Sequence, residues 1–191
     1  VMKRTLPCAT MFVLLLLVAC GKREESARPA VDSTAVVEAA PALPDSVLSR
    51  RFTPEFTTPE ALAQAFLQAV EKKDRKGLHE LLVNEHEFKY WLWPEFPASD
   101  PAMNVPLDFA WNNLMVKSDK GLRRILRTIG GQKLTLASVY CNEPEELFRS
   151  FVVQGGTTMD VVDAQGLTAT LDILSSMVRL NGTYKFMSYK E

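Results

Sequence analysis

Apolar residues recur every three or four positions between residues 58 and 129, which predicts amphipathic helices in this part of the chain. We expect the first helix to begin at Thr58, because a threonine hydroxyl can accept a hydrogen bond from the first turn. Pro59 and Glu60 follow it, and both are favourable in the first turn of a helix. The apolar face of this helix carries Leu62, Ala65, Phe66, Ala69 and Val70.

Three more helices are predicted downstream of the first. Asp74 is expected to cap the second helix, a third is predicted to start near Pro106, and Ser118 is expected to open a fourth. Between the second and the third lies an aromatic segment, Phe88–Pro97, whose two prolines oppose a regular helix. The glycine pair at 130–131 is expected to end the fourth helix.

After residue 131 the apolar pattern changes to the two-residue alternation that is typical of strands. Asn181–Gly182 predicts a two-residue hairpin turn, because both residues readily accept positive φ angles. Helices followed by antiparallel strands predict an α+β fold in which the helices pack on a curved sheet. The expected strands cover residues 134–141, 147–154, 159–163, 167–180 and 183–189.

The predicted hairpin also determines which side chains share a face of the sheet, because residues paired across two strands point to the same side. The face expected to pack on the first helix carries Leu171, Ile173, Met177, Tyr184 and Phe186. The opposite face is apolar too, so either the extra helices cover it or it pairs two copies of the chain. This candidate interface consists of Leu174, Val178, Leu180, Met187 and Tyr189.

An unbroken apolar run, Met11–Ala19, follows the cationic residues Lys3 and Arg4. The run is shorter than the roughly 20 residues that a membrane-spanning helix needs. Its length and its basic flank are typical of a signal peptide. The run leads into Leu17-Val18-Ala19-Cys20-Gly21, which resembles the lipobox of bacterial lipoproteins.

This resemblance implies that the Cys20 thiolate takes up a diacylglycerol group and that the leader is then removed. A further acyl chain such as palmitate would make attachment to the membrane effectively permanent, because each buried methylene contributes about 0.8 kcal/mol. Gly21 stands where lipoproteins of the inner membrane carry aspartate, which favours the outer membrane and a periplasmic domain. The expected parts are a signal peptide (1–19), a lipid-anchored disordered linker (20–56) and one folded domain (57–191).

Composition and charge exclude some classes of function. The net charge of −1 becomes −3 when Lys3 and Arg4 leave with the signal peptide, because the chain has 22 Lys and Arg against 23 Asp and Glu. An acidic chain is a poor nucleic-acid binder, so no nucleic-acid partner is expected. Cys141 has no partner left once Cys8 is removed and Cys20 is acylated, which excludes a disulfide framework.

The folded part opens with Pro59–Phe66, continues through a Lys73–Asp74 junction, and closes with a hairpin at Leu180–Phe186 that ends in an aromatic-Lys-aromatic strand. These features, in this order, resemble the nuclear-transport-factor-2-like cone fold, also called SnoaL-like or cystatin-like. The resemblance implies helices packed on a curved antiparallel sheet, often with a pocket between them. The segment 87–131 departs from the family's usual layout by two extra helical stretches.

The sequence predicts no catalytic residue, no metal site and no cofactor. General acid–base catalysis needs a carboxylate or a histidine with a shifted pKa in an apolar cavity. His79 is expected in a solvated stripe of the second helix, and His86 in a hydrated loop beside Glu85 and Glu87, where spacing suggests no third metal ligand. The side of the sheet on which Asp160 lies is left open.

The density of aromatic residues suggests either a pocket for an apolar or sugar-like ligand, or a small core beneath a long loop. The candidate pocket consists of Trp91, Trp93, Trp111, Tyr184 and Phe186.

Three functions are consistent with these patterns. The first is a lipid-anchored envelope module that binds a small ligand or a protein partner without catalysis. The second is a SnoaL-like isomerase or hydrolase, which requires a carboxylate or histidine inside the cone. The third is a structural homodimer formed through the outer face of the sheet.

Overall fold

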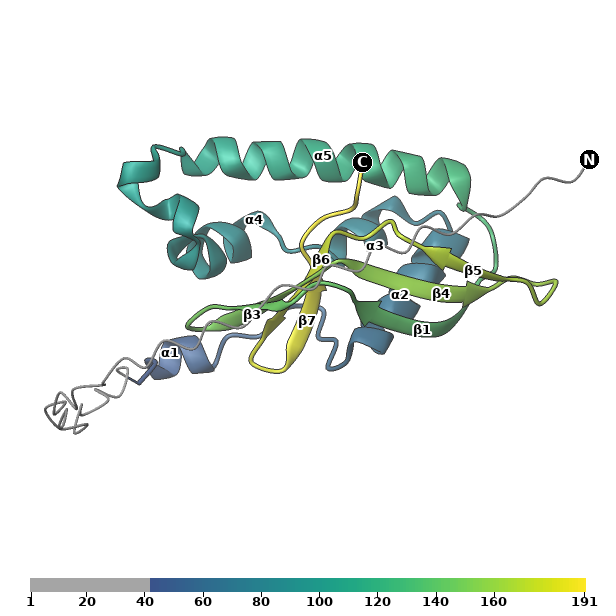
Figure 1. Cartoon of the computed structure of the whole chain (residues 1–191), viewed down its shortest axis with the longest axis horizontal. Helices are drawn as coiled ribbons and strands as arrows, with labels where there is room; N and C mark the ends of the chain where they lie inside the picture. The colour runs from purple at the N-terminus through teal and green to yellow at the C-terminus, as the bar shows by residue number, and fades with distance from the viewer. Residues whose placement is uncertain (1–41) are drawn as a thin grey trace, which may run out of the picture. The chain divides into compact units, whose positions relative to one another are not determined.

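The chain adopts an α+β fold in which helices precede two antiparallel sheets, as seen in a computed structural model that describes residues 42–191 (Figure 1). The predicted signal peptide, Cys20 and the linker as far as residue 41 lie outside the described residues. The α-helices are α1 (Asp45–Leu48), α2 (Pro59–Glu71), α3 (Arg75–Glu80), α4 (Glu85–Glu87) and α5 (Leu107–Thr128).

Between α4 and α5 the chain forms one π-helical turn and three short 3-10 turns, here called the η region. Its elements are η1 (Phe88–Leu92), η2 (Trp93–Glu95), η3 (Pro97–Ser99) and η4 (Pro101–Met103). The strands are β1 (Thr135–Cys141), β2 (Glu145–Leu147), β3 (Phe151–Gly155), β4 (Thr157–Val162), β5 (Thr168–Leu171), β6 (Ser176–Leu180) and β7 (Thr183–Phe186).

The predicted caps of the first two helices are confirmed. The hydroxyl of Thr58 accepts a hydrogen bond from the amide of Ala61 at 3.1 Å, which starts α2. The carboxylate of Asp74 accepts one from the amide of Gly77 at 2.9 Å, which starts α3. Both side chains thus satisfy amide groups that have no partner within the helix.

The two helices predicted from Pro106 and Ser118 are in fact one helix, α5, of 22 residues (Figure 1). Ser118 lies inside it, 1% exposed, and its hydroxyl accepts a hydrogen bond from the amide of Tyr189 at 3.2 Å. The prediction was wrong because the serine bonds to the C-terminal segment instead of capping a helix. Within residues 42–191 no helix combines the length and apolar character needed to cross a bilayer.

The strands form a three-stranded sheet, in the order β1-β4-β5, and a four-stranded sheet, in the order β2-β3-β6-β7. The predicted strand 167–180 is therefore wrong as a single element, because β5 belongs to the first sheet and β6 to the second. The predicted strand 147–154 is likewise divided between β2 and β3, which pair with each other. The chain changes direction or sheet at these breaks, which simple alternation does not reveal.

The predicted hairpin turn is confirmed. Asn181 and Gly182 have φ angles of 45° and 83°, and the adjacent residues pair as Leu180 with Thr183 and Val178 with Lys185. The face expected to pack on the first helix does so, because all five of its residues lie in or against the core that α2 covers. The four-stranded sheet therefore has the predicted orientation at β6 and β7.

The candidate interface is corrected by the structure, because its residues are covered within one chain. Val178 and Leu180 are buried in a second core beneath the η region, and Met187 packs against that core. Leu174 and Tyr189 are buried in the first core instead, since the chain passes between the sheets near residue 174. These five residues therefore do not form an open sheet face through which two copies pair.

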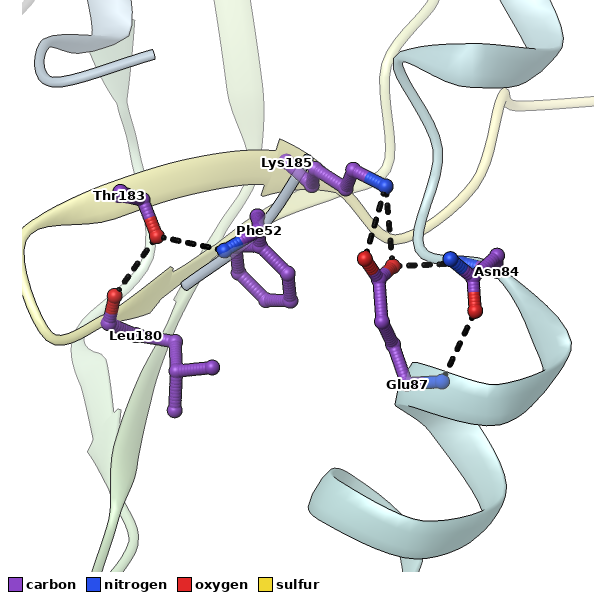
Figure 2. A network of polar contacts seen from close by, with 6 residues as sticks. All are labelled: Phe52, Asn84, Glu87, Leu180, Thr183 and Lys185. Carbon is purple, nitrogen blue, oxygen red and sulfur yellow. Dashed lines mark hydrogen bonds and ion pairs between the residues drawn. The ribbon is translucent and has the colours of Figure 1, made fainter. Parts of the chain in front are cut away.

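The fold begins earlier than the predicted boundary at residue 57. Phe52 is 0% exposed, and its amide donates to the hydroxyl of Thr183 at 3.1 Å, while that hydroxyl donates to the carbonyl of Leu180 at 2.9 Å (Figure 2). The side chain of Asn181 donates to the carbonyls of Val47 and Arg50 at 2.8 and 3.1 Å. Residues 45–56 thus belong to the folded unit and not to the linker.

Candidate functional site

The aromatic segment begins at a helix start that its own sequence encodes. The amide of Glu87 donates to Asn84 Oδ1 at 2.9 Å, and the amide of Asn84 donates to Glu87 Oε2 at 2.8 Å (Figure 2). This reciprocal pair is a capping box, which satisfies two amides at the start of α4. The helix then widens into the π-helical turn η1, which carries the aromatic side chains over the sheet.

A buried ion pair joins this segment to the last strand. Lys185 Nζ lies 3.0 Å from each carboxylate oxygen of Glu87, and the two residues are 1% and 3% exposed (Figure 2). The ring of Phe52 lies 5.8 Å from the same ammonium group. An unpaired charge at this depth is strongly unfavourable, so the pair holds α4 and β7 in one arrangement.

Two further polar contacts hold the η region in place. Lys89 Nζ lies 2.5 Å from Asp108 Oδ1 and 2.8 Å from Glu85 Oε1, which links η1 to the first turn of α5. Hydrogen bonds to Asp108 and then to Glu85 raise the pKa of Lys89. On the other side, the amide and hydroxyl of Ser150 donate to Glu95 at 3.0 and 2.5 Å, which links η2 to the turn between β2 and β3.

Between these contacts lies an apolar groove of about 440 Å³, here called the aromatic groove. Its walls come from the η region and α5, and its floor from β3 and from the residue that follows β7. The apolar lining residues are Phe88, Trp93, Phe96, Ala98, Val105, Phe109, Ala110, Leu114, Val153 and Met187. The polar lining residues are Asn113, Lys117 and Glu146, all of them exposed, so polar groups are confined to its rim.

The candidate pocket predicted from the sequence is only partly one site. Trp93 lines the aromatic groove, and the rings of Trp93 and Trp111 lie 5.8 and 5.4 Å from the ring of Phe88. Trp91 lies apart from them and stacks on Phe52 at 6.3 Å. The other two residues, Tyr184 and Phe186, belong to the opposite face of the sheet.

Tyr184 and Phe186 belong to the first core and not to the groove. The ring of Phe186 packs edge-on against Phe66 of α2 at 6.0 Å. Placing them with the tryptophans was wrong, because the β6–β7 register points them toward α2. Val153 and Met187 also line the groove and were not predicted from the sequence, although the apolar outer face that contains Met187 indicated a covered surface.

The other candidate ionisable residues lie outside the groove. Asp160 accepts hydrogen bonds from Thr170, Ser138 and Tyr140 at 2.6, 3.1 and 3.4 Å, and these bonds lower its pKa. Cys141 in β1 is free, and burial raises the pKa of its thiol. His79 Nε2 lies 3.4 Å from Asp119 Oδ1, near the surface.

The Glu-His-Glu run separates in the structure, because Glu87 turns inward to Lys185 while Glu85 pairs with Lys89. His86 packs against the rings of Tyr90 and Trp91 at 4.9 and 5.8 Å. In the part of the chain that the structure describes, no three residues of the His, Cys, Asp and Glu types are grouped so that they could hold a metal ion.

The aromatic groove is thus a hollow with apolar walls and a polar rim, and ion pairs and hydrogen bonds hold the surrounding elements in place. Such an arrangement can bind a small apolar body and orient a polar group at its edge. Comparison of the chain with protein-family models, with curated proteins and with solved structures finds no match.

Proposed function

We propose that this protein is a lipid-anchored cell-envelope protein whose domain binds a small, largely apolar ligand in the aromatic groove without catalysis. The observation that carries the proposal is the groove itself. Its volume of about 440 Å³ falls within the roughly 300–1,000 Å³ of small-molecule sites. Its walls are aromatic and aliphatic, and its few polar groups stand at the rim, as in sites that bind an apolar body and orient one polar end.

The rigid frame of the groove supports binding further. The Glu87–Lys185 pair, the Lys89–Asp108 pair and the bonds between Glu95 and Ser150 hold its walls before any ligand arrives. A site that is already formed loses less conformational entropy on binding than one that must be ordered.

The enzymatic alternative has no such support. An isomerase or hydrolase needs an acid or histidine that faces a cavity. Among residues 42–191, the ionisable residues that line the groove are Lys117 and Glu146, both exposed at the rim. The buried carboxylate of Glu87 is already engaged by Lys185 and by the amide of Asn84.

A fluorescence experiment tests ligand binding. The probe is N-phenyl-1-naphthylamine, a neutral apolar fluorophore, added to the full chain carrying Cys20→Ser. Energy transfer from Trp93 to the probe is expected on binding, and Ala110→Phe is expected to abolish most of it by filling the groove. Ala164→Phe, on the exposed turn before β5, adds the same ring elsewhere and is the control. Equal transfer in the two variants would refute the proposal.

The lipid anchor rests on the lipobox-like residues Leu17–Gly21 and on the short apolar run before them. Cys20→Ser is expected to abolish labelling by a clickable fatty acid and to move the protein into the soluble fraction. Cys141→Ser is the matched control and is expected to retain full labelling, because that cysteine lies in a strand of the domain. Labelling that persists in Cys20→Ser would exclude the anchor while leaving the groove proposal intact.

We also infer that the domain is a divergent member of the nuclear-transport-factor-2-like cone family. The helices-first order and the closing Leu180–Phe186 hairpin support this inference, while the η region and α5 are additions to the family's layout. An experimental structure in which the two sheets curve as one around α2 is the expected result. Two flat sheets that diverge from each other would reject the assignment.

A further inference from the structure

A second hollow, which shares no lining residue with the aromatic groove, lies beside the turn that joins β2 to β3, and two arginines line it. It has a volume of about 270 Å³ and sits between the turn that joins β2 to β3 and the end of β6. Arg149 comes from the turn and Arg179 from β6, where it pairs across the sheet with Val152. The two arginines thus come from separate parts of the chain and line the same hollow.

Arg179 has unused capacity for hydrogen bonding. Its Nε is buried and has no hydrogen-bond partner within the described chain. Its Nη2 lies 3.9 Å from Glu145 Oε2, which is longer than a hydrogen bond. Native structures leave few buried donors without an acceptor, so the unpaired Nε indicates that the guanidinium group of Arg179 still lacks a hydrogen-bond partner.

The neighbouring polar groups do not supply that partner. The side chain of Asn181 donates to the carbonyls of Val47 and Arg50, and the amide and hydroxyl of Ser150 donate to Glu95. Glu145 accepts its short hydrogen bond, 2.7 Å, from the side chain of Gln154. Although Nε itself is buried, the side chain of Arg179 is 41% exposed, so a ligand in solvent can reach the rest of its guanidinium group.

We propose that the hollow between Arg149 and Arg179 binds a phosphate group, either free or in a lipid headgroup. A guanidinium group presents parallel N–H donors that match two oxygens of a phosphate, which gives bidentate binding. The hollow has room for this group and for the first atoms of whatever carries it. This site is separate from the aromatic groove, and the inference does not depend on the proposed function.

Nitrogen-15 NMR of the full chain carrying Cys20→Ser tests the site, with inorganic phosphate as the first probe. Phosphate is expected to shift the Nε–H resonance of Arg179 in a saturable way. Arg179→Gln is expected to weaken binding about tenfold or more, and Arg179→Lys is expected to weaken it too, because lysine keeps the charge but loses the planar donors. A Nε–H resonance that phosphate does not move would refute the site.

Two further variants separate a built site from general charge attraction. Glu145→Gln is expected to tighten binding, because it removes the carboxylate that faces Arg179. Arg123→Gln removes an exposed arginine of α5 and is expected to leave the affinity unchanged. A loss in Arg123→Gln as large as in Arg179→Gln would overturn the proposal.

Vesicles distinguish the two sources of phosphate. If the ligand is a lipid headgroup, vesicles of phosphatidylcholine with phosphatidylglycerol are expected to sediment the wild-type domain and not Arg179→Gln. If it is a free phosphate compound, the NMR shift is expected without sedimentation on either kind of vesicle. Sedimentation that is identical for the wild type and for Arg179→Gln would count against the headgroup.

Discussion

At the scale of single residues, the buried charges are the most consequential feature of the domain. Glu87 and Lys185 come from segments 98 residues apart, and each is the main neutralising partner of the other. Neither residue stands out in the sequence, because Glu87 looks like part of an acidic loop and Lys185 like an ordinary alternating strand position. Their depth means that either charge without the other is strongly unfavourable in the folded state.

Glu87→Gln and Lys185→Met are each expected to lower the free energy of unfolding by about 3–5 kcal/mol, because each leaves an unpaired group in a buried site. The double variant Glu87→Leu/Lys185→Met is expected to lose less unfolding free energy than the two single variants lose together, because it leaves no unpaired charge. Urea denaturation measures all three. The exposed pair Lys76–Glu80, at 3.6 Å, is the control, and Lys76→Gln is expected to cost under about 0.5 kcal/mol. Equal costs in Lys76→Gln and Glu87→Gln would contradict this assignment.

A pH effect is expected from Tyr189. Burial raises the pKa of its hydroxyl above the usual 10.0, and the hydroxyl donates to the carbonyl of Leu78 at 2.6 Å. The folded chain therefore retains the tyrosine proton when the unfolded chain has begun to lose it. The stabilising contribution is complete below pH 10 and falls as the pH rises further.

Tyr189→Phe is expected to lower the free energy of unfolding by about 1–3 kcal/mol at neutral pH, because the carbonyl of Leu78 loses its donor. The difference between wild type and Tyr189→Phe is expected to shrink as the pH rises above 10. Denaturant unfolding at several alkaline pH values measures it. If the difference in unfolding free energy between wild type and Tyr189→Phe does not change with pH, the pKa of Tyr189 is not raised by burial.

At the scale of elements, the sequence predicted what local chemistry determines and missed what distant partners determine. The starts of α2 and α3 were predictable because Thr58 and Asp74 bond within their own turns. The unbroken course of α5 was not, because Ser118 is used by Tyr189, which follows it by 71 residues. The division of residues 167–180 between two sheets was not predicted either, because it depends on the distant strands with which β5 and β6 pair.

The candidate site shows the same limit. The density of aromatic residues pointed to Trp93, which lines the groove, and to Trp111, which packs behind it on Phe88. The groove also needs Val153 and Met187, which the aromatic pattern does not include. Trp91 belongs to the same short segment and yet lies against Phe52, because the π-helical turn of η1 changes the direction of successive side chains. The density of aromatic residues in the sequence therefore identified the region of the groove but not its geometry.

Gly121 in α5 lies directly against the C-terminal segment. A Cβ atom at Gly121 would lie 2.4 Å from the carbonyl oxygen of Lys190, so the C-terminal segment can approach the helix only because the side chain is absent. Gly121→Ala is expected to destabilise the fold by about 1–3 kcal/mol, although alanine favours a helix.

Asn112→Ala, at an exposed position of the same helix, is the control and is expected to be neutral or slightly stabilising. Thermal unfolding followed by circular dichroism compares the two. If Gly121→Ala melts at or above the temperature of Asn112→Ala, the close packing of residues 189–190 on α5 does not constrain the domain.

At the scale of the whole molecule, the domain includes a stretch that composition alone assigns to a linker. Phe52 completes the second core, and the amide of Tyr184 donates to the carbonyl of Phe56 at 2.8 Å. The composition of residues 42–56 is polar on average, and it does not reveal that Phe52 and Phe56 make specific contacts with the domain. The predicted boundary at residue 57 therefore lies too late in the chain.

Phe52→Ala is expected to reduce the free energy of unfolding by about 3–5 kcal/mol, the usual cost of removing a buried phenylalanine ring. A chain that begins at residue 57 is expected to unfold at a clearly lower urea concentration than one that begins at residue 42. Arg51→Ala, next to Phe52 but exposed, is the control and is expected to change little. Equal midpoints for the chains starting at 42 and 57 would place residues 42–56 outside the cooperative unit.

The mixed origin of the aromatic groove has a practical consequence. Its lining comes from the η region, α5, β2, β3 and the residue after β7, so the hollow exists only when all these stretches are assembled. A compound that binds in the groove therefore has no equivalent site on the denatured chain. Its binding stabilises the folded state and raises the melting temperature. At a free concentration a hundred times its Kd, such a compound adds about 2.7 kcal/mol to the unfolding free energy, so a melting-temperature screen ranks chemical libraries without a functional assay.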